Sequence, residues 1–263
     1  MSAPHSNGQA LSRILAAMTA AQEALRPYAP GAIAVERKAF GDIVTAADRA
    51  VNVALRSSLL RVDEGWLSEE SADDLSRLDL PRLWIVDPID GTREFVEGIP
   101  EWGISVAWVE DGRPVAGGVF NPQAKQLMLG AAGSGVTLND TAVAVTKHGL
   151  SGARILASRS EINHGAWKQF DRAPFSYAPM GSVAYKLALV ACGKADATFT
   201  LVPKNEWDVA GGVALVEAAG GRVVGLDGKP IAFNRRSTLL SGLIAGSPDI
   251  VEELLRYLPR TAS

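Results

Sequence analysis

Cysteine is almost absent from this sequence, which has one cysteine and three histidines among 263 residues. The single cysteine, Cys192, excludes a disulfide within the chain. It lies in an apolar run, which predicts a buried core residue, and a reducing cytoplasm is the expected compartment. His5, His148 and His164 are not spaced as metal ligands, so the sequence does not favour a zinc site.

The sequence also lacks an apolar run long enough to span a membrane and an N-terminal signal pattern. Its 26 basic and 29 acidic residues give a net charge of −3, without a basic stripe that could follow a nucleic-acid backbone. We therefore expect neither a membrane nor a nucleic-acid polymer as partner. A hydrophobic content of 47% with 21% charged residues is typical of a globular chain.

The most informative motif is WIVDPIDGT at 84–92, where an apolar run ends in two carboxylates. We expect the strand to stop at Asp87, because Pro88 cannot donate to a central ladder. A turn through Asp90 and Thr92 then points two carboxylates and a free backbone carbonyl into one small space. Mg²⁺ requires such oxygen ligands, although Asp-Pro and Asp-Gly are also ordinary turn signals.

Two further acidic segments strengthen the case for a metal. Glu69 and Glu70 follow a short apolar piece, where adjacent like charges favour a bound cation; a solvated loop is the alternative. Asp208 lies in the first turn of a helix that we expect to end at Ala219, and the helix dipole alone would also stabilise it there. Two glycines at 211–212 cost that helix roughly 1 kcal/mol each, so we expect another element to approach closely.

The rest of the sequence alternates helical and strand patterns. Thr45 to Asp48 resembles a capping box in which Asp replaces the usual Glu. We expect the first helix to bury Leu11, Ile14, Leu15, Met18 and Leu25, and the next to bury Val51, Leu55 and Leu59. Strands are expected over residues 84–86, 104–109, 115–120, 154–157, 195–199 and 243–245.

The domain organisation follows from where this pattern changes. Residues 144–147 are either an edge strand or a linker, and the pattern resets at about 149–152. We therefore expect an N-terminal α+β domain over 1–149 and a C-terminal α/β domain over 150–263, in a chain of mixed α and β class. A hairpin is expected at Asp227-Gly228.

Three motifs in this order, Glu-Glu-Ser at 69–71, Asp-Pro-Ile-Asp-Gly-Thr at 87–92 and Trp-Asp-Val-Ala at 207–210, resemble the inositol monophosphatase superfamily. The resemblance covers the chain from about Gly41 to Gly246. It implies a layered α-β-α-β-α, sugar-phosphatase-like fold with the active site between two halves. It also implies an Mg²⁺-dependent, commonly lithium-sensitive phosphatase that acts on a small phosphorylated substrate and is commonly a homodimer.

The resemblance also implies roles for individual residues. Thr92 and Asp48 would deprotonate the attacking water, and Glu69 would support catalysis through the metal. Two or three Mg²⁺ ions would be held by Glu69, Asp87, the carbonyl of Ile89, Asp90 and Asp208. The substrate would contact Gly91, Thr92, Gly181, Ser182 and Asp208.

The substrate itself is less defined by the sequence. Arg-Glu-Phe at 93–95, and Glu206 before the Trp-Asp pair, are similar to the 3'(2'),5'-bisphosphate nucleotidase branch, and residues 200–204 lack the acid expected for inositol binding. We therefore favour conversion of 3'-phosphoadenosine 5'-phosphate to AMP, with Lys186 and Lys204 as candidates for a second phosphate. Inositol 1-phosphate and histidinol phosphate are alternatives. A non-catalytic regulator is the alternative of a different class, which unused, mutually repelling carboxylates disfavour.

Overall fold

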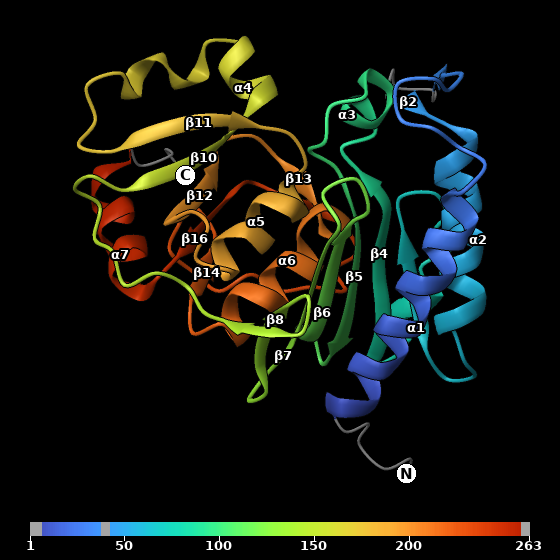
Figure 1. The fold of residues 1–263 in the computed structure, drawn as a ribbon. Helices are drawn as coiled ribbons and strands as arrows, with labels where there is room; N and C mark the ends of the chain where they lie inside the picture. The colour runs from blue at the N-terminus through green and yellow to red at the C-terminus, as the bar shows by residue number, and fades with distance from the viewer. Residues whose placement is uncertain (1–6, 38–42, 259–263) are drawn as a thin grey trace.

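The computed structural model describes residues 7–37 and 43–258 of the chain, so His5 and Gly41 lie outside the described residues. The elements form five layers in the order helix, sheet, helix, sheet, helix (Figure 1). This arrangement confirms the expected layered fold. The layers matter for function because the two sheets are joined by a central pair of helices, and residues from both sides of that pair meet at one end.

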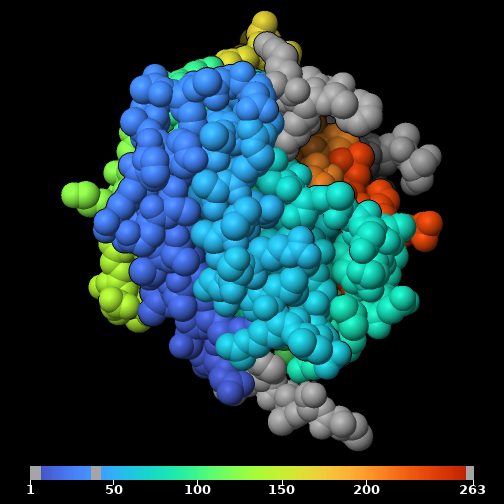
Figure 2. Space-filling view, turned by 90° about the vertical axis from the view of Figure 1, so that its right-hand side faces the viewer, coloured from blue at the N-terminus to red at the C-terminus, as the bar shows by residue number. Residues whose placement is uncertain are grey.

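The first sheet has seven strands in the order β3-β4-β5-β6-β7-β8-β9. β3 is parallel to β4, and the other neighbours are antiparallel. Its strands are β3 (Gly65–Ser68), β4 (Arg82–Asp90), β5 (Gly103–Glu110), β6 (Arg113–Asn121), β7 (Gln126–Ala131), β8 (Gly135–Leu138) and β9 (Thr141–Val143). α1 (Asn7–Leu25) and α2 (Ala46–Leu59) cover its outer face and form the convex surface seen in Figure 2.

The second sheet has five strands in the order β11-β10-β12-β16-β14. Its strands are β10 (Arg154–Ser158), β11 (Ser176–Met180), β12 (Ala197–Thr200), β14 (Arg222–Val224) and β16 (Leu243–Gly246). α5 (Val183–Ala191) and α6 (Glu206–Ala218) lie between the two sheets, and α7 (Pro248–Tyr257) packs on the far face (Figure 1).

Short elements complete the chain. Two ribbons pair β1 (Glu36–Arg37) with β2 (Ile43–Val44) and β13 (Lys204–Asn205) with β15 (Leu239–Leu240). The short helices are η1 (Ser76–Asp79), α3 (Thr92–Glu97), α4 (Arg159–Asn163) and η2 (Ala166–Phe170). Within the described residues, no helix combines the length and the apolar content that a membrane span needs.

The buried face of α1 differs from the expected one at Leu15, which is exposed, and at Leu11, which is only half-buried. Ile14, Met18 and Leu25 are buried, but Leu15 is 46% exposed. The buried positions recur at three- and four-residue intervals, and Leu15 lies about 100° further round the helix than Ile14. Arg13 is buried instead, because its guanidinium pairs with the Glu64 carboxylate at 2.6 Å.

The expected end of the central strand at Asp87 is wrong, because β4 continues to Asp90. Pairing with β5 shifts register between these two residues, as a β-bulge does. Pro88 is tolerated there because β3 pairs with β4 only as far as Val86, so the missing donor leaves no ladder bond open on that side. The bulge keeps both carboxylates at one end of the sheet.

The helix glycines allow the close packing that the sequence predicted. A Cβ on Gly211 would lie 2.5 Å from the Ser105 hydroxyl of β5, and one on Gly212 would lie 2.4 Å from the Leu187 Cβ of α5. Both distances are shorter than atomic contact allows, so only glycine lets α6 approach its neighbours this closely. The start of α6, which carries Asp208, is thereby held against the first sheet.

Two other expectations concern the C-terminal part. Residues 144–147 form a linker without helix or strand, and the expected boundary near Gly149 follows it. The division into two domains stays a prediction, because the largest apolar core cluster draws residues from both parts. The prediction of a hairpin at Asp227-Gly228 is wrong. The chain turns there, with the Gly225 amide donating to the Lys229 carbonyl at 2.9 Å. However, β14 pairs with the later strand β16 and not with a strand directly after the turn.

Candidate active site

A cavity of about 410 Å³ opens where the central helices meet the ends of both sheets. All the site residues expected from the sequence line it except Asp48, which contacts Thr92 from behind. The lining residues from the first part are Ile43, Glu69, Asp87, Ile89, Asp90, Gly91, Thr92, Arg93 and Glu94. Those from the second part are Ser158, Arg159, Ser160, His164, Met180, Gly181, Ser182, Val183, Lys186, Lys204 and Asp208.

Three carboxylates converge at the inner end of this cavity. Glu69 follows β3, Asp87 lies on β4, and Asp208 lies in the first turn of α6. One oxygen of each lies within 4.8 Å of the others. The spacing is suited to a shared cation, since carboxylates at this distance repel one another when no positive charge lies between them.

The electrostatics of these residues fit a divalent ion. Burial, followed by the like charges of Glu69 and Asp90, holds the pKa of Asp87 well above its usual range. Burial, followed by the charge of Asp90, raises the pKa of Asp208 to about 8. All the donors are oxygens, which Mg²⁺ and similar hard cations prefer. Such an ion would offset both the repulsion and the cost of burial.

Asp90 also binds two groups at the start of α5. Its Oδ2 accepts hydrogen bonds from the Ser182 hydroxyl at 2.6 Å and from the Ala184 amide at 2.5 Å. Burial raises its pKa, and these two bonds oppose the rise. Asp90 therefore fastens the start of α5 to β4 through one oxygen.

Thr92 and Asp48 form the expected pair. The Thr92 hydroxyl lies 3.2 Å from Asp48 Oδ1 and 3.0 Å from the Ile89 carbonyl. The other oxygen of Asp48 accepts from the Thr45 amide at 2.8 Å and from its hydroxyl at 2.6 Å, which confirms the capping box. One carboxylate thus caps α2 with Oδ2 and orients a hydroxyl with Oδ1. Burial raises the pKa of Asp48, against the bonds from Thr45.

Gly181 and Ser182 are present in the cavity wall, but their polar groups already have protein partners. The Gly181 amide donates to Glu101 at 2.8 Å. A Cβ on Gly181 would lie 2.4 Å from the Glu94 carboxyl carbon, so a larger residue would displace the Glu94 side chain. The Ser182 hydroxyl donates to Asp90 and accepts from the Tyr185 amide.

The basic residues of the cavity differ in how far they are buried or already paired, and so in how readily they could bind an anion. Lys186 is only 2% exposed and donates to the Ser182 carbonyl at 3.1 Å; burial lowers its pKa to about 8, against the charge of Asp90. Arg159 pairs with Glu101 at 2.5 Å. Arg93 and His164 are exposed at the cavity mouth.

Sequence reasoning missed the part of the wall that β10 and α4 provide. Ser158 directly follows the predicted strand and caps α4 by accepting from the Glu161 amide, so the cap is the signal that could have found it. Nothing local marks Arg159 or His164 as cavity residues. Glu206, which the sequence linked to the substrate, is buried outside the lining residues and binds the backbone amides of Asn234 and Arg235.

Comparison with known proteins agrees with this site. Residues 9–261 match the Inositol monophosphatase family. The chain is 34% identical over 227 residues to the 3'-phosphoadenosine 5'-phosphate phosphatase of Mycobacterium leprae. The aligned region covers 83% of this chain and 82% of that protein. It is 32% identical over 237 residues to the Nus factor SuhB of Pasteurella multocida, with 84% of each chain covered.

A solved structure gives the same result for the fold. The inositol monophosphatase from Anabaena superposes with a TM-score of 0.81 at 28% identity, and the match covers 96% of this chain and 97% of that one. The family match extends over nearly the whole chain and includes both sides of the cavity. The chain therefore belongs to the inositol monophosphatase family.

Proposed function

We propose that this chain uses divalent cations to hydrolyse 3'-phosphoadenosine 5'-phosphate to AMP and phosphate. Membership of the inositol monophosphatase family makes the chain a phosphatase. The observation that carries the proposal is that the carboxylates of Glu69, Asp87 and Asp208 lie within 4.8 Å of one another in the cavity that also contains Thr92.

The proposed ligand set is the one that the family resemblance implies, and all of its members line the cavity. The proposed ligands are Glu69, Asp87, the carbonyl of Ile89, Asp90 and Asp208. Bound Mg²⁺ ions would neutralise the phosphoryl oxygens, make a water molecule more acidic and stabilise the leaving oxygen. Oxygen-only donors favour Mg²⁺ over softer metals.

Thr92 is proposed to orient and deprotonate the attacking water. Its hydroxyl has one proton, and donating that proton to Asp48 leaves the lone pairs of Oγ1 to accept from water. Asp48 is fixed for this task because Thr45 holds its other oxygen. Water would give one proton to Thr92 Oγ1 as Thr92 gives its own proton to Asp48, while the water oxygen bonds to phosphorus and the bond from phosphorus to the ester oxygen breaks. The leaving oxygen would take a proton from solvent, and Asp48 would release one to solvent. Gly91 and Thr92 are proposed to contact the phosphate.

The preference for a nucleotide with a second phosphate is supported by the outer wall of the cavity. Arg93, His164 and Lys204 line the cavity, where Arg93 and Lys204 offer positive charge to an anion. The relative from Mycobacterium leprae carries the corresponding name. Inositol 1-phosphate is the second candidate, since the structural neighbour from Anabaena is named an inositol monophosphatase. Inhibition by lithium and a homodimeric state are proposed from the family resemblance, and a cytoplasmic location is proposed from the single cysteine.

Release of inorganic phosphate from a panel of monoesters tests the proposal. The panel contains 3'-phosphoadenosine 5'-phosphate, inositol 1-phosphate, histidinol phosphate and fructose 1,6-bisphosphate, each assayed with Mg²⁺ and with EDTA. We expect the highest kcat/KM for the nucleotide, loss of activity in EDTA and recovery with Mg²⁺. Full activity after metal removal would refute the metal site. A chain that binds Mg²⁺ but releases no phosphate from any substrate would support the non-catalytic alternative.

A further inference from the structure

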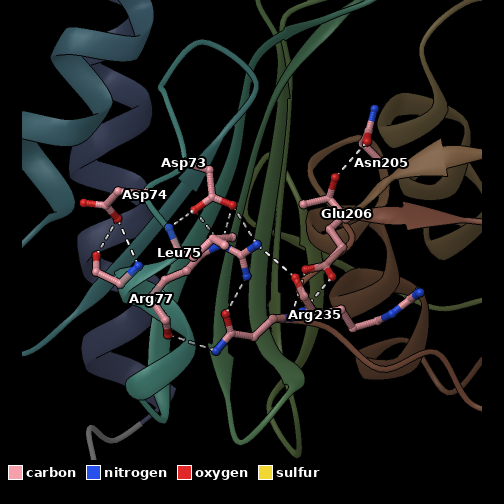
Figure 3. A network of polar contacts seen from close by, with 10 residues as sticks. Asp73, Asp74, Leu75, Arg77, Asn205, Glu206 and Arg235 are labelled. Atoms are coloured by element: carbon pink, nitrogen blue, oxygen red, sulfur yellow. Dashed lines mark hydrogen bonds and ion pairs between the residues drawn. The ribbon is translucent and has the colours of Figure 1, made fainter.

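A polar network connects Asp73, four residues after Glu69, to Glu206, two residues before Asp208 (Figure 3). Its centre is Arg77 of η1, which is only 1% exposed. Arg77 and its partner Asn234 are 157 positions apart in the sequence. Neither residue lines the cavity. The network therefore links the two parts of the chain behind the site and not within it.

Arg77 braces the Glu69 segment from both ends. Its Nη2 donates to the Asp73 carboxylate at 2.8 Å, just after that segment. Its side-chain stem packs on Gly65, the first residue of β3, where an added Cβ would lie 3.1 Å from the Arg77 Cβ. Glu69 lies between these two contacts in the sequence. A shift of the Arg77 side chain would therefore be transmitted to the backbone on either side of Glu69.

The Arg77 guanidinium also hydrogen-bonds Asn234 and the residue that follows it. Arg77 Nη1 donates to Asn234 Oδ1 at 2.8 Å, and Nη2 also donates to the Arg235 carbonyl at 2.9 Å. In return, Asn234 Nδ2 donates to the carbonyls of Arg77 at 3.1 Å and Leu80 at 3.3 Å. Asn234 has a φ of +58°, a left-handed conformation that asparagine tolerates better than most residues.

The same loop holds the start of α6. The backbone amides of Asn234 and Arg235 donate to the two oxygens of Glu206 at 2.8 and 2.9 Å. Glu206 in turn lies two residues before Asp208, and its own amide donates to the Thr238 carbonyl at 2.9 Å. The chain of hydrogen bonds thus runs from Asp73 through Arg77, Asn234 and Glu206 to the first turn of α6.

We propose that Arg77 and Asn234 are positioning residues that hold Glu69 and Asp208 at the separation needed to share a divalent cation. The proposal rests on the metal site proposed above. The physical reason is that the clustered carboxylates repel one another, and a cross-link behind the site resists their separation. Removing a group that hydrogen-bonds a metal ligand directly typically changes metal affinity by about 10- to 100-fold. Arg77 and Asn234 act through the backbone beside the ligands, so we expect a loss at the lower end of that range.

The variant Asn234→Gly tests the link with little disturbance of the backbone. Glycine accepts the left-handed φ and keeps the amide that binds Glu206, but it removes every side-chain contact with Arg77. The matched control is Asn139→Gly. Asn139 also has a positive φ, of +46°, and also bonds the backbone, at Leu127 and Lys125, but it lies at the opposite edge of the first sheet from β3.

The measurement is the dissociation constant for Mg²⁺, obtained by calorimetry on the metal-free protein without substrate. We expect Asn234→Gly to bind Mg²⁺ at least about tenfold more weakly than the natural protein, and Asn139→Gly to bind it equally well. The kcat of Asn234→Gly should return toward the natural value at saturating Mg²⁺. An unchanged dissociation constant in Asn234→Gly, whatever its melting temperature, would overturn the proposal.

Arg77→Lys provides a second variant, since lysine keeps the positive charge but lacks the planar guanidinium that bonds Asp73, Asn234 and the Arg235 carbonyl together. The same loss of Mg²⁺ affinity is expected, and an unchanged affinity would again count against the link. The natural protein separates the two hypotheses. If it binds no Mg²⁺ or Mn²⁺, the proposed metal site fails; if it binds them and the variants bind equally well, only the positioning role fails.

Discussion

The hydroxyl of Thr92 lies 3.2 Å from the carboxylate of Asp48, a residue 44 positions earlier in the chain. The contact is possible because the bulged end of β4 brings Thr92 to the first turn of α2, where Thr45 holds the other Asp48 oxygen. Asp48 is thus oriented by its own helix before it orients Thr92. In the proposed reaction, water would attack from the side of the cavity on which Thr92 lies.

Replacing Thr92 by alanine should separate catalysis from metal binding. Thr92→Ala removes the hydroxyl proposed to act on water, so kcat should fall by about 10²- to 10⁴-fold. The dissociation constant for Mg²⁺, measured by calorimetry, should change little because Thr92 is not a proposed ligand. Thr92→Ser keeps the hydroxyl and is the control, with activity near that of the natural protein. An equal loss of metal affinity in Thr92→Ala would contradict the role given to Thr92.

Asp90 and Asp208 should act through the same ion. They come from β4 and α6, and both line the cavity. Either residue replaced by asparagine should lower kcat/KM by several orders of magnitude while the protein stays folded. The double variant should be hardly worse than either single one. Multiplicative losses in kcat/KM would mean that the two residues act independently.

The close packing of α6 should make one glycine irreplaceable. Alanine is better than glycine within a helix by about 1 kcal/mol. Gly211→Ala nevertheless places a Cβ 2.5 Å from the Ser105 hydroxyl and 3.1 Å from the Val106 carbonyl. We expect the free energy of unfolding in urea to fall by about 1–3 kcal/mol. An equal or higher stability would show that α6 can move away from the sheet at no cost.

The Arg13–Glu64 pair should contribute stability that depends on pH. Burial alone would raise the pKa of Glu64, but hydrogen bonds from Arg13 and Trp84 outweigh it and hold the pKa below the usual 4.5. The contribution is therefore present above about pH 4.5 and is lost as the pH falls through the lowered pKa. Glu64→Gln should cost about 3–5 kcal/mol near neutral pH, because it leaves Arg13 buried without its counter-charge.

Urea unfolding from pH 7 down to pH 3 measures this effect. The difference in stability between the natural protein and Glu64→Gln should narrow below pH 4.5, where Glu64 itself becomes protonated. Glu23→Gln is the control, because Glu23 pairs with Arg26 on the surface, where both side chains are more than half exposed. A constant difference at all pH values would mean that the charge of Glu64 contributes nothing.

The sequence alone determined the parts of the site that depend on neighbouring residues. The Asp-Pro-Ile-Asp-Gly-Thr segment predicts a carboxylate pair at a strand end because proline, glycine and aspartate restrict the chain locally. The capping box at Thr45 and the close approach at Gly211 follow from the chemistry of four-residue windows in the same way. The family resemblance rests on these local motifs, and the fold match agrees with it.

Tertiary structure decided what depends on residues far apart in the chain. The continuation of β4 past Pro88 is possible only because β3 ends early, and no local pattern records where a neighbouring strand ends. Arg159 and His164 enter the cavity because two parts of the chain face each other, and Arg77 meets Asn234 for the same reason. Local periodicity shows which face of an element is buried, but only the packed layers determine what that face meets.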